Sequence, residues 1–366
     1  MTFAAAFTGT WRTILTSKTL LSTMLLAVVL YAFYYPAPYS HEAAQRLPVV
    51  VVDQDNSALS RAMILDLDAT RAIHVVDVVS NVETARGEMR AGEADGVVLV
   101  TRGLERQLRA GAPGAGVAVW VNATYLLRAS TIGEAVTSVV RELAARRLAP
   151  GTQSDRAGLP ITVVSEPLFN RTGGYKGYVF PAVAVIIIQQ TLLFGTATFM
   201  AGRRGTGIWR MGGREYLGSL AAFTSVGTVG CLFLFGLIFW LQEVPVSENV
   251  AGMIAAVPIF SASVAGMGLL AGSFFDRAER AMVILPPTSV PFFFLSGTAW
   301  PLDQMPTMVS AVSHLFPSTL GVHTFVPLNQ MNASIGDVMS SVSMMILMAA
   351  VYGTLAAWRI VERKRT

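Results

Sequence analysis

The densest run of acidic and hydroxyl side chains is DQDNS at 53–57. Alternating carboxylates could bind calcium, but an EF-hand loop needs glycine at its sixth position and glutamate at its twelfth. Those positions hold Ala58 and Ile64. The run also follows an apolar stretch and precedes a helical pattern, and Asn56 or Ser57 would suit the N-cap of that helix. We therefore favour a strand-end turn with a helix cap over a metal site.

The other residues with catalytic potential are not spaced for catalysis. The four histidines, His41, His74, His314 and His323, lie apart from one another and from acid pairs, and Cys231 is the single cysteine. One cysteine excludes an intrachain disulfide and a thiolate metal cluster. The sequence has no nucleophile elbow, zinc motif, dinucleotide loop or P-loop. We predict a chain that is not an enzyme and holds no cofactor, so that ATP and Mg would bind to a partner subunit.

Two adjacent glutamines, Gln189 and Gln190, lie near the middle of an otherwise apolar helical stretch. A polar pair at membrane depth is costly, which makes it a functional candidate. The alternative is a helix-to-helix hydrogen bond worth about 1 kcal/mol, and the sequence does not separate the two. Small residues in the later apolar stretches are spaced to suit close helix packing: Gly227, Gly230, Gly266, Gly268 and Gly272.

A further candidate site is the loop 203–215, RRGTGIWRMGGRE, which joins two apolar stretches. It is either a solvated basic loop or a short helix that docks on a cytoplasmic partner through apolar residues rimmed by arginines. Exposed Trp and Met between arginines favour docking. The candidate contact residues are Arg203, Arg204, Ile208, Trp209, Arg210, Met211, Arg214 and Glu215.

The composition is that of a membrane protein. Of 366 residues, 53% are hydrophobic and 14% are charged, and the mean hydropathy of +0.53 lies outside the range of an ordinary soluble domain. Residues 1–17 predict an amphipathic helix on the membrane surface, and residues 19–36 predict a first span. A cleaved signal peptide is the rival interpretation of this first segment. Five more spans are predicted at 178–201, 219–241, 250–275, 281–300 and 339–360.

The span at 281–300 is interrupted by Pro286, Pro287 and Pro291. Each proline removes a backbone donor and disfavours helical geometry in the residue before it. Irregular backbone at membrane depth must be buried against protein or line a cavity. The apolar stretch at about 303–326 is too short to cross the membrane and return, so we expect a re-entrant or interfacial hairpin there.

Residues 37–172 differ in character from the flanking parts, 1–36 and 173–366. Short β-branched runs, from 47–55 to 159–167, alternate with helical patterns. This alternation indicates an α/β domain with at least partly parallel strands. The predicted fold is an α-helical membrane bundle of six transmembrane helices plus a re-entrant hairpin, with an inserted α/β extracytoplasmic domain.

Basic residues indicate the orientation. If the amino terminus is cytoplasmic, the cytoplasmic segments carry twelve basic and four acidic residues, the short outer segments have a net charge of −3, and residues 37–172 have −1. This asymmetry fits the positive-inside rule. The basic pI near 9.4 therefore reflects topology rather than nucleic-acid binding.

Three motifs resemble the ABC-2 type exporter permeases, in the subgroup with a large extracytoplasmic domain after the first helix. They are VVVVDQDNSALSRAM at 49–63, Y-x-F-P at 178–181, and FLSGTAWPLDQMP at 294–306 followed by HLFPSTLGV at 314–322. The resemblance covers essentially the whole chain. It implies a protein of the bacterial cytoplasmic (inner) membrane, with both termini cytoplasmic and the large domain periplasmic.

The resemblance also implies partners and a transport path. Two permease subunits, identical or paralogous, would form the membrane core, and two ABC ATPase subunits would bind at the loop around Trp209 and at the amino-terminal helix. Some relatives work with a membrane-fusion adaptor and an outer-membrane channel. A hydrophobic, drug-like or envelope-related substrate would leave along the second and fifth spans, with Gln189, Gln190, Phe292, Phe293 and Phe294 as path candidates. The alternative is a membrane-anchored receptor or scaffold that uses its extracytoplasmic domain for recognition.

Overall fold

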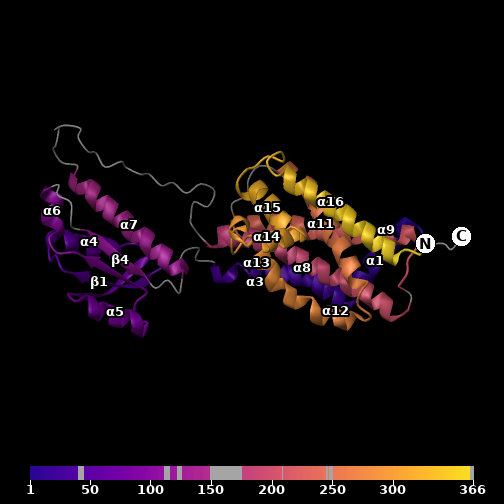
Figure 1. Cartoon of the computed structure of the whole chain (residues 1–366), viewed down its shortest axis with the longest axis horizontal. Helices are drawn as coiled ribbons and strands as arrows, with labels where there is room; N and C mark the ends of the chain where they lie inside the picture. Colours follow the sequence, from indigo (N-terminus) through magenta and orange to yellow (C-terminus); the bar gives the residue numbers. More distant parts are fainter. Residues whose placement is uncertain are drawn as a thin grey trace. The chain divides into compact units, whose positions relative to one another are not determined.

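The computed structural model describes residues 1–39, 45–110, 116–121, 126–148, 175–207, 209–244, 246 and 250–362. The chain divides into two compact units. One is built from Met1–Ser40 and Glu166–Thr366, and the other from His41–Ser165, which interrupts the first in sequence. Figure 1 draws the second unit in purple, with a sheet at its centre, and the first as a set of long helices.

The unit within His41–Ser165 contains a four-stranded sheet in the order β2-β1-β3-β4. The central strand β1 (Leu47–Asp53) pairs in parallel with both β2 (Ile73–Val79) and β3 (Gly96–Val100), while β4 (Val117–Val121) runs antiparallel to β3. The predicted, partly parallel pairing is therefore confirmed for these strands. The predicted strand at 159–167 lies outside the described residues.

Helices cover both faces of this sheet (Figure 1). Side chains alternate along a strand, so successive residues of β1 enter two different cores. One core contains side chains of α4 (Ala58–Asp68) and α7 (Leu126–Leu148), and the other contains a side chain of α5 (Val82–Ala91). The sequence did not predict the short α6 (Leu104–Ala110). Its seven residues are too few to display a helical period.

The acidic run after β1 forms a turn and caps two helices. The carboxylate of Asp53 accepts the amides of Asp55 and Asn56 at 3.0 and 2.9 Å. Ser57 is the N-cap of α4 and forms a capping box with Ser60. The Asp55 carboxylate accepts two backbone amides at the start of α6, at 2.7 and 3.1 Å. The predicted helix cap is confirmed, with Ser57 in that role.

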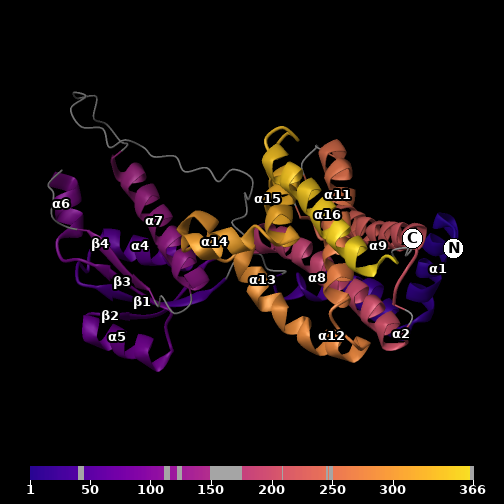
Figure 2. The same ribbon diagram turned by 45° about the vertical axis from the view of Figure 1, so that its right-hand side comes forward.

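The helical unit starts with a bent pair of segments. α1 (Phe3–Thr16) meets the helical segment Lys18–Tyr34 at 86°. This second segment consists of α2 (Lys18–Leu21), a π-turn at Ser22–Leu26 and α3 (Ala27–Tyr34). The bend agrees with a surface helix that leads into a span. Figure 2 shows α1 beside α9, with which it makes extensive contact.

Among the described residues, four helices are long and apolar enough to cross a membrane, and a fifth span results if the bent pair counts as one. All four coincide with predicted spans, whereas the number six stays a prediction. The four comprise α8 (Tyr175–Gly205), α9 (Gly213–Leu232) extended to Leu241 through a π-turn, α11 (Val250–Gly272) and α16 (Met339–Ile360).

Glycines allow α11 to lie very close to its neighbours. A Cβ added at Gly272 would lie 2.5 Å from the carbonyl oxygen of Ala197 in α8, and one at Gly266 would lie 3.0 Å from the amide nitrogen of Gly353 in α16. Such short backbone separations exclude any larger residue without a shift of the helices. The predicted close packing of these small residues is confirmed.

The broken span has the predicted interruption but not its predicted geometry. α12 (Ala278–Ile284) is followed by a 3-10 turn, Pro286–Thr288, and then by α13 (Ser289–Leu295). Leu285 keeps helical dihedral angles, so the prediction that each proline displaces the preceding residue is wrong here. Pro291 lies within the first turn of α13, where a proline needs no amide partner and fits the helix.

Two further helices follow the broken span. α14 (Thr307–Ser313) is largely exposed, whereas α15 (Pro317–Gln330) is largely buried and packs against α8, α11 and α16. The apolar stretch at 303–326 thus contains α14 and most of α15. The predicted hairpin and its re-entrant position in a membrane stay predictions.

Candidate functional site

The candidate site is a cavity of about 530 Å³ inside the helical unit. Three elements form its wall: the first segment, Lys18–Tyr34, together with α8 and α13. The wall is mostly apolar and aromatic, which is typical of small-molecule sites. Its lining residues are Ser22, Thr23, Ala27, Tyr31, Tyr35, Val183, Ile186, Ile187, Gln190, Thr191, Phe194, Ser289 and Phe293.

Gln190 is the notable polar group of this wall. Its side chain is 5% exposed, and neither its amide oxygen nor its amide nitrogen has a hydrogen-bond partner among the described residues. Leaving a buried polar group unpaired costs about 1–3 kcal/mol. Three hydroxyls of the wall are paired, because Ser22, Thr191 and Ser289 donate to backbone carbonyls three or four residues earlier. Gln190 therefore lines the cavity with a side chain whose donor and acceptor are unpaired but covered by protein, so a ligand would reach them through a change of this side chain's rotamer.

Gln189 has a different role from its neighbour. Its amide oxygen accepts the backbone N–H of Ser318, in the first turn of α15. The first amides of a helix have no partner within the helix, so this contact satisfies one of them. The sequence left a role in the substrate path and a role in helix packing open for the two glutamines. In the structure Gln189 makes the interhelical hydrogen bond, and Gln190 lines the cavity.

The three phenylalanines predicted for the path separate as well. Phe293 lines the cavity. Phe292 is buried, and its ring centre lies 4.5 Å from that of Phe316, so it joins α13 to the start of α15. Phe294 is 54% exposed, and its ring centre lies 5.6 Å from that of Phe293. Of the five predicted path residues, only Gln190 and Phe293 line this cavity.

Sequence reasoning missed the contribution of the first segment. Thr23, Ala27, Tyr31 and Tyr35 recur every four residues and share one face of a helix. Thr23 also lies in the π-turn, a distortion that is frequent at functional sites. This period-four series of small and aromatic-hydroxyl residues in an apolar span was the signal that could have identified the cavity wall.

The second predicted site, the loop 203–215, is not a short helix. Met211 is 1% exposed and forms a parallel bridge with Val361 after α16. The prediction that Met211 is an exposed contact is therefore wrong, because its side chain packs into the core of the helical unit. Ile208 lies outside the described residues.

The rest of this loop is held by arginines. The Trp209 ring is half-buried, and the guanidinium groups of Arg204 and Arg210 lie 5.5 and 5.3 Å from its centre. Arg203 forms an ion pair of 2.8 Å with Glu215. Arg214 is exposed in the first turn of α9.

One carbonyl joins three helix ends near this loop. The oxygen of Ser273, just after α11, accepts hydrogen bonds from Arg204 at the end of α8 and from Arg359 at the end of α16. Arg359 also lies over the ring of Phe274, at 4.1 Å. The loop is thus attached to the same ends of α8, α11 and α16.

Comparisons with known proteins agree with this architecture. Residues 18–358 match the family of ABC-2 family transporter proteins. The chain is 20% identical over 359 residues to the linearmycin resistance permease protein LnrN of Bacillus subtilis, covering 90% of this chain and 91% of that protein. It is 21% identical over 207 residues to the probable multidrug ABC transporter permease YbhR of Escherichia coli, covering 54% of this chain and 55% of that protein. The match thus spans about half the length of YbhR. Because the family match extends over nearly the whole sequence, the chain belongs to the ABC-2 transporter family as a permease.

Proposed function

We propose that the chain is the membrane subunit of an ATP-driven exporter that moves hydrophobic, drug-like or envelope-related molecules outward. The observation that carries this proposal is the cavity with the unpaired amide of Gln190. An apolar wall with one unpaired amide, which a rotamer change of Gln190 would turn toward the cavity, suits a ligand that is largely apolar and has at least one hydrogen-bonding group. The names of the relatives, which refer to multidrug transport and antibiotic resistance, support this substrate class.

In this proposal the chain crosses the bacterial inner membrane six times. The bent first segment and the broken span α12–α13 supply the two crossings beyond the four long helices. Both termini and the loop 203–215 face the cytoplasm, and the α/β unit is periplasmic. The arginine-rich ends of α8 and α16 support this orientation.

We further propose that a separate ABC ATPase binds at the loop around Trp209. The half-buried Trp209 ring lies close to the guanidinium groups of Arg204 and Arg210, and Trp and Arg are both enriched at protein interfaces. A second permease, identical or paralogous, completes the membrane core. A membrane-fusion adaptor and an outer-membrane channel are candidate partners of the periplasmic side.

Co-purification of the full chain with a co-expressed ATPase tests this proposal. Combining Trp209→Ala with Arg210→Ala should lower the stimulation of ATP hydrolysis by the permease without changing its elution volume in detergent. The matched control combines Trp240→Ala with Arg102→Ala, which removes the same residue types from exposed positions elsewhere. If no ATPase associates in mild detergent, the alternative of a receptor or scaffold gains support, and binding of envelope components should then be measured.

A further inference from the structure

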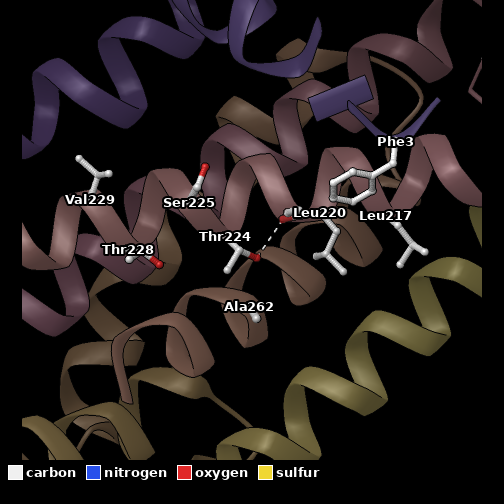
Figure 3. A pocket seen from close by; sticks show the side chains of 9 residues that line it. Phe3, Leu217, Leu220, Thr224, Ser225, Thr228, Val229 and Ala262 are labelled. Carbon is white, nitrogen blue, oxygen red and sulfur yellow. Dashed lines mark hydrogen bonds between the residues drawn. The ribbon is translucent and has the colours of Figure 1, made fainter. Parts of the chain in front are cut away.

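A second cavity, of about 590 Å³, lies on another side of the helical unit. Figure 3 shows its lining side chains, from Phe3 and Leu217 at one end to Thr228 and Val229 at the other. α9 supplies most of this wall, α1 supplies Phe3, and α11 supplies Ala262. We call this cavity the α9 groove.

The α9 groove offers almost no free polar groups. Thr224 donates its hydroxyl to the carbonyl of Leu220 at 2.9 Å, as the dashed line in Figure 3 marks. Ser225 donates to the carbonyl of Ala222 and accepts the indole N–H of Trp11 at 3.0 Å. The Ser225 hydroxyl is therefore already paired both as a donor and as an acceptor. The groove thus suits an alkyl chain rather than a polar ligand.

The dimensions of the groove match one membrane leaflet. Leu217 and Val229 lie twelve residues apart on a helix, which corresponds to about 18 Å at 1.5 Å per residue. The hydrocarbon core of a bilayer is about 30 Å thick, so each leaflet contributes about 15 Å. The groove begins near the first turn of α9, and the end of a membrane-spanning helix is expected near the membrane interface.

A positive charge stands at that end of the groove. Arg214 precedes Leu217 by three residues and Ala221 by seven, so it lies on the same face of α9 as the groove. Arg214 is exposed and has no hydrogen bond or ion pair with the residues that the structure describes. The neighbouring acid, Glu215, is neutralised by its ion pair with Arg203. The N-cap, Gly212, makes no side-chain hydrogen bond, so the amide end of the helix dipole adds to the positive field.

We propose that the α9 groove binds one anionic phospholipid of the leaflet that adjoins the loop 203–215. One acyl chain fills the groove, and the phosphate lies near Arg214. This inference rests on family membership and on the membrane location of α9, and not on the direction or substrate of transport. A lipid bound here would also contact Phe3, and would thereby hold α1 against α9.

Native mass spectrometry of the purified full chain in detergent tests the proposal. Palmitoyl-oleoyl phosphatidylglycerol and palmitoyl-oleoyl phosphatidylcholine are titrated separately, without ATPase or nucleotide. The wild-type protein should bind the anionic lipid about fivefold more tightly, because a basic residue near the membrane surface contributes about 1 kcal/mol toward anionic lipid. Arg214→Gln should remove this preference, whereas Arg277→Gln, at another exposed arginine, should keep it.

Filling the groove provides a second, independent variant. Ala221→Trp should weaken binding of both lipids at the tight site, whereas Ala350→Trp, on the exposed face of α16, should leave it unchanged. Equal affinity for the two lipids in the wild-type protein, or retention of tight binding in both Arg214→Gln and Ala221→Trp, would overturn the proposal. Because binding is measured on the permease alone, failure of the proposed exporter function would not affect the result.

Discussion

The unequal roles of the two adjacent glutamines lead to opposite effects of the same substitution. Gln190→Leu replaces a buried, unpaired amide with an apolar side chain of similar size. Removing such a group relieves part of its desolvation cost of about 1–3 kcal/mol. We therefore expect Gln190→Leu to leave the ligand-free protein as stable as the wild type or more stable, by about 1 kcal/mol.

Gln189→Leu is the matched control and should destabilise the protein. It removes the acceptor for the buried amide of Ser318, and interhelical hydrogen bonds in membrane proteins contribute about 0.6 kcal/mol on average and about 1.7 at most. The melting temperature should fall on the order of 2–4 °C for a loss of about 1 kcal/mol. Thermal denaturation of the two variants in one detergent provides the comparison.

For transport, we expect Gln190→Leu to have the larger effect and Gln189→Leu the smaller one. A substrate that pairs with the amide of Gln190 loses a hydrogen bond worth about 1 kcal/mol in Gln190→Leu. The concentration of a hydrophobic antibiotic that half-stimulates ATP hydrolysis should therefore rise about fivefold. In Gln189→Leu that concentration should change little. Destabilisation by Gln190→Leu together with unchanged stimulation would refute the assignment of this amide to a ligand.

The remaining predictions concern packing, capping and topology. Gly272→Ala should destabilise the protein by about 1–3 kcal/mol because its Cβ would meet backbone of α8, whereas Gly236→Ala, with open space around it, should cost little in thermal denaturation. Asp55→Ala should speed amide hydrogen exchange in α6 about fivefold, since a lost cap costs about 1 kcal/mol, whereas Glu93→Ala should not. Burial raises the pKa of Asp55, but its hydrogen bonds to Ser57 and to the amides of α6 outweigh burial and lower the pKa below its usual value. Its stabilising effect is therefore present above about pH 4 and lost as the pH falls through the lowered pKa, so the difference between Asp55→Ala and the wild type should shrink in acid. Cysteines introduced at Glu93 and Arg210 should react with a membrane-impermeant label from opposite sides of the membrane, and the native Cys231 is buried and should not react. Labelling of both positions from one side would refute the proposed orientation.

The long elements were predictable because each carries a strong local pattern. The helix α16 begins and ends at the predicted residues, 339 and 360, since an uninterrupted apolar run has a single solution in lipid. The strand β1 was equally clear from its run of valines, and Ser57 from its place before a helical pattern. In these cases local propensity and tertiary packing agree.

The predictions that were wrong or left open concern residues whose surroundings depend on contacts between distant segments. Met211 was predicted to be exposed because it lies among arginines, yet its burial results from a bridge to Val361, 150 positions later. The different roles of Gln189 and Gln190 depend on where α15 places Ser318. Adjacent residues on a helix point about 100° apart, so a sequence pattern cannot determine which one meets a cavity. The position of α15 determines which of the two glutamines forms the hydrogen bond to Ser318 and which one lines the cavity.

α8 connects the two predicted sites in a single rigid element. Gln190 lines the cavity, and Arg203 and Arg204 lie in the last turn of the same helix, about 20 Å further along at 1.5 Å per residue. Because Gly272 lets the α8 backbone touch α11, and Ser273 then joins α8 to α16, a displacement at the loop cannot be absorbed by α8 alone. In the proposed exporter, an ATPase that moves this loop would shift α8 together with α11 and α16. The first segment and α13, which form the opposite walls of the cavity, have no such attachment at this carbonyl, so the cavity is the place where the relative movement would occur.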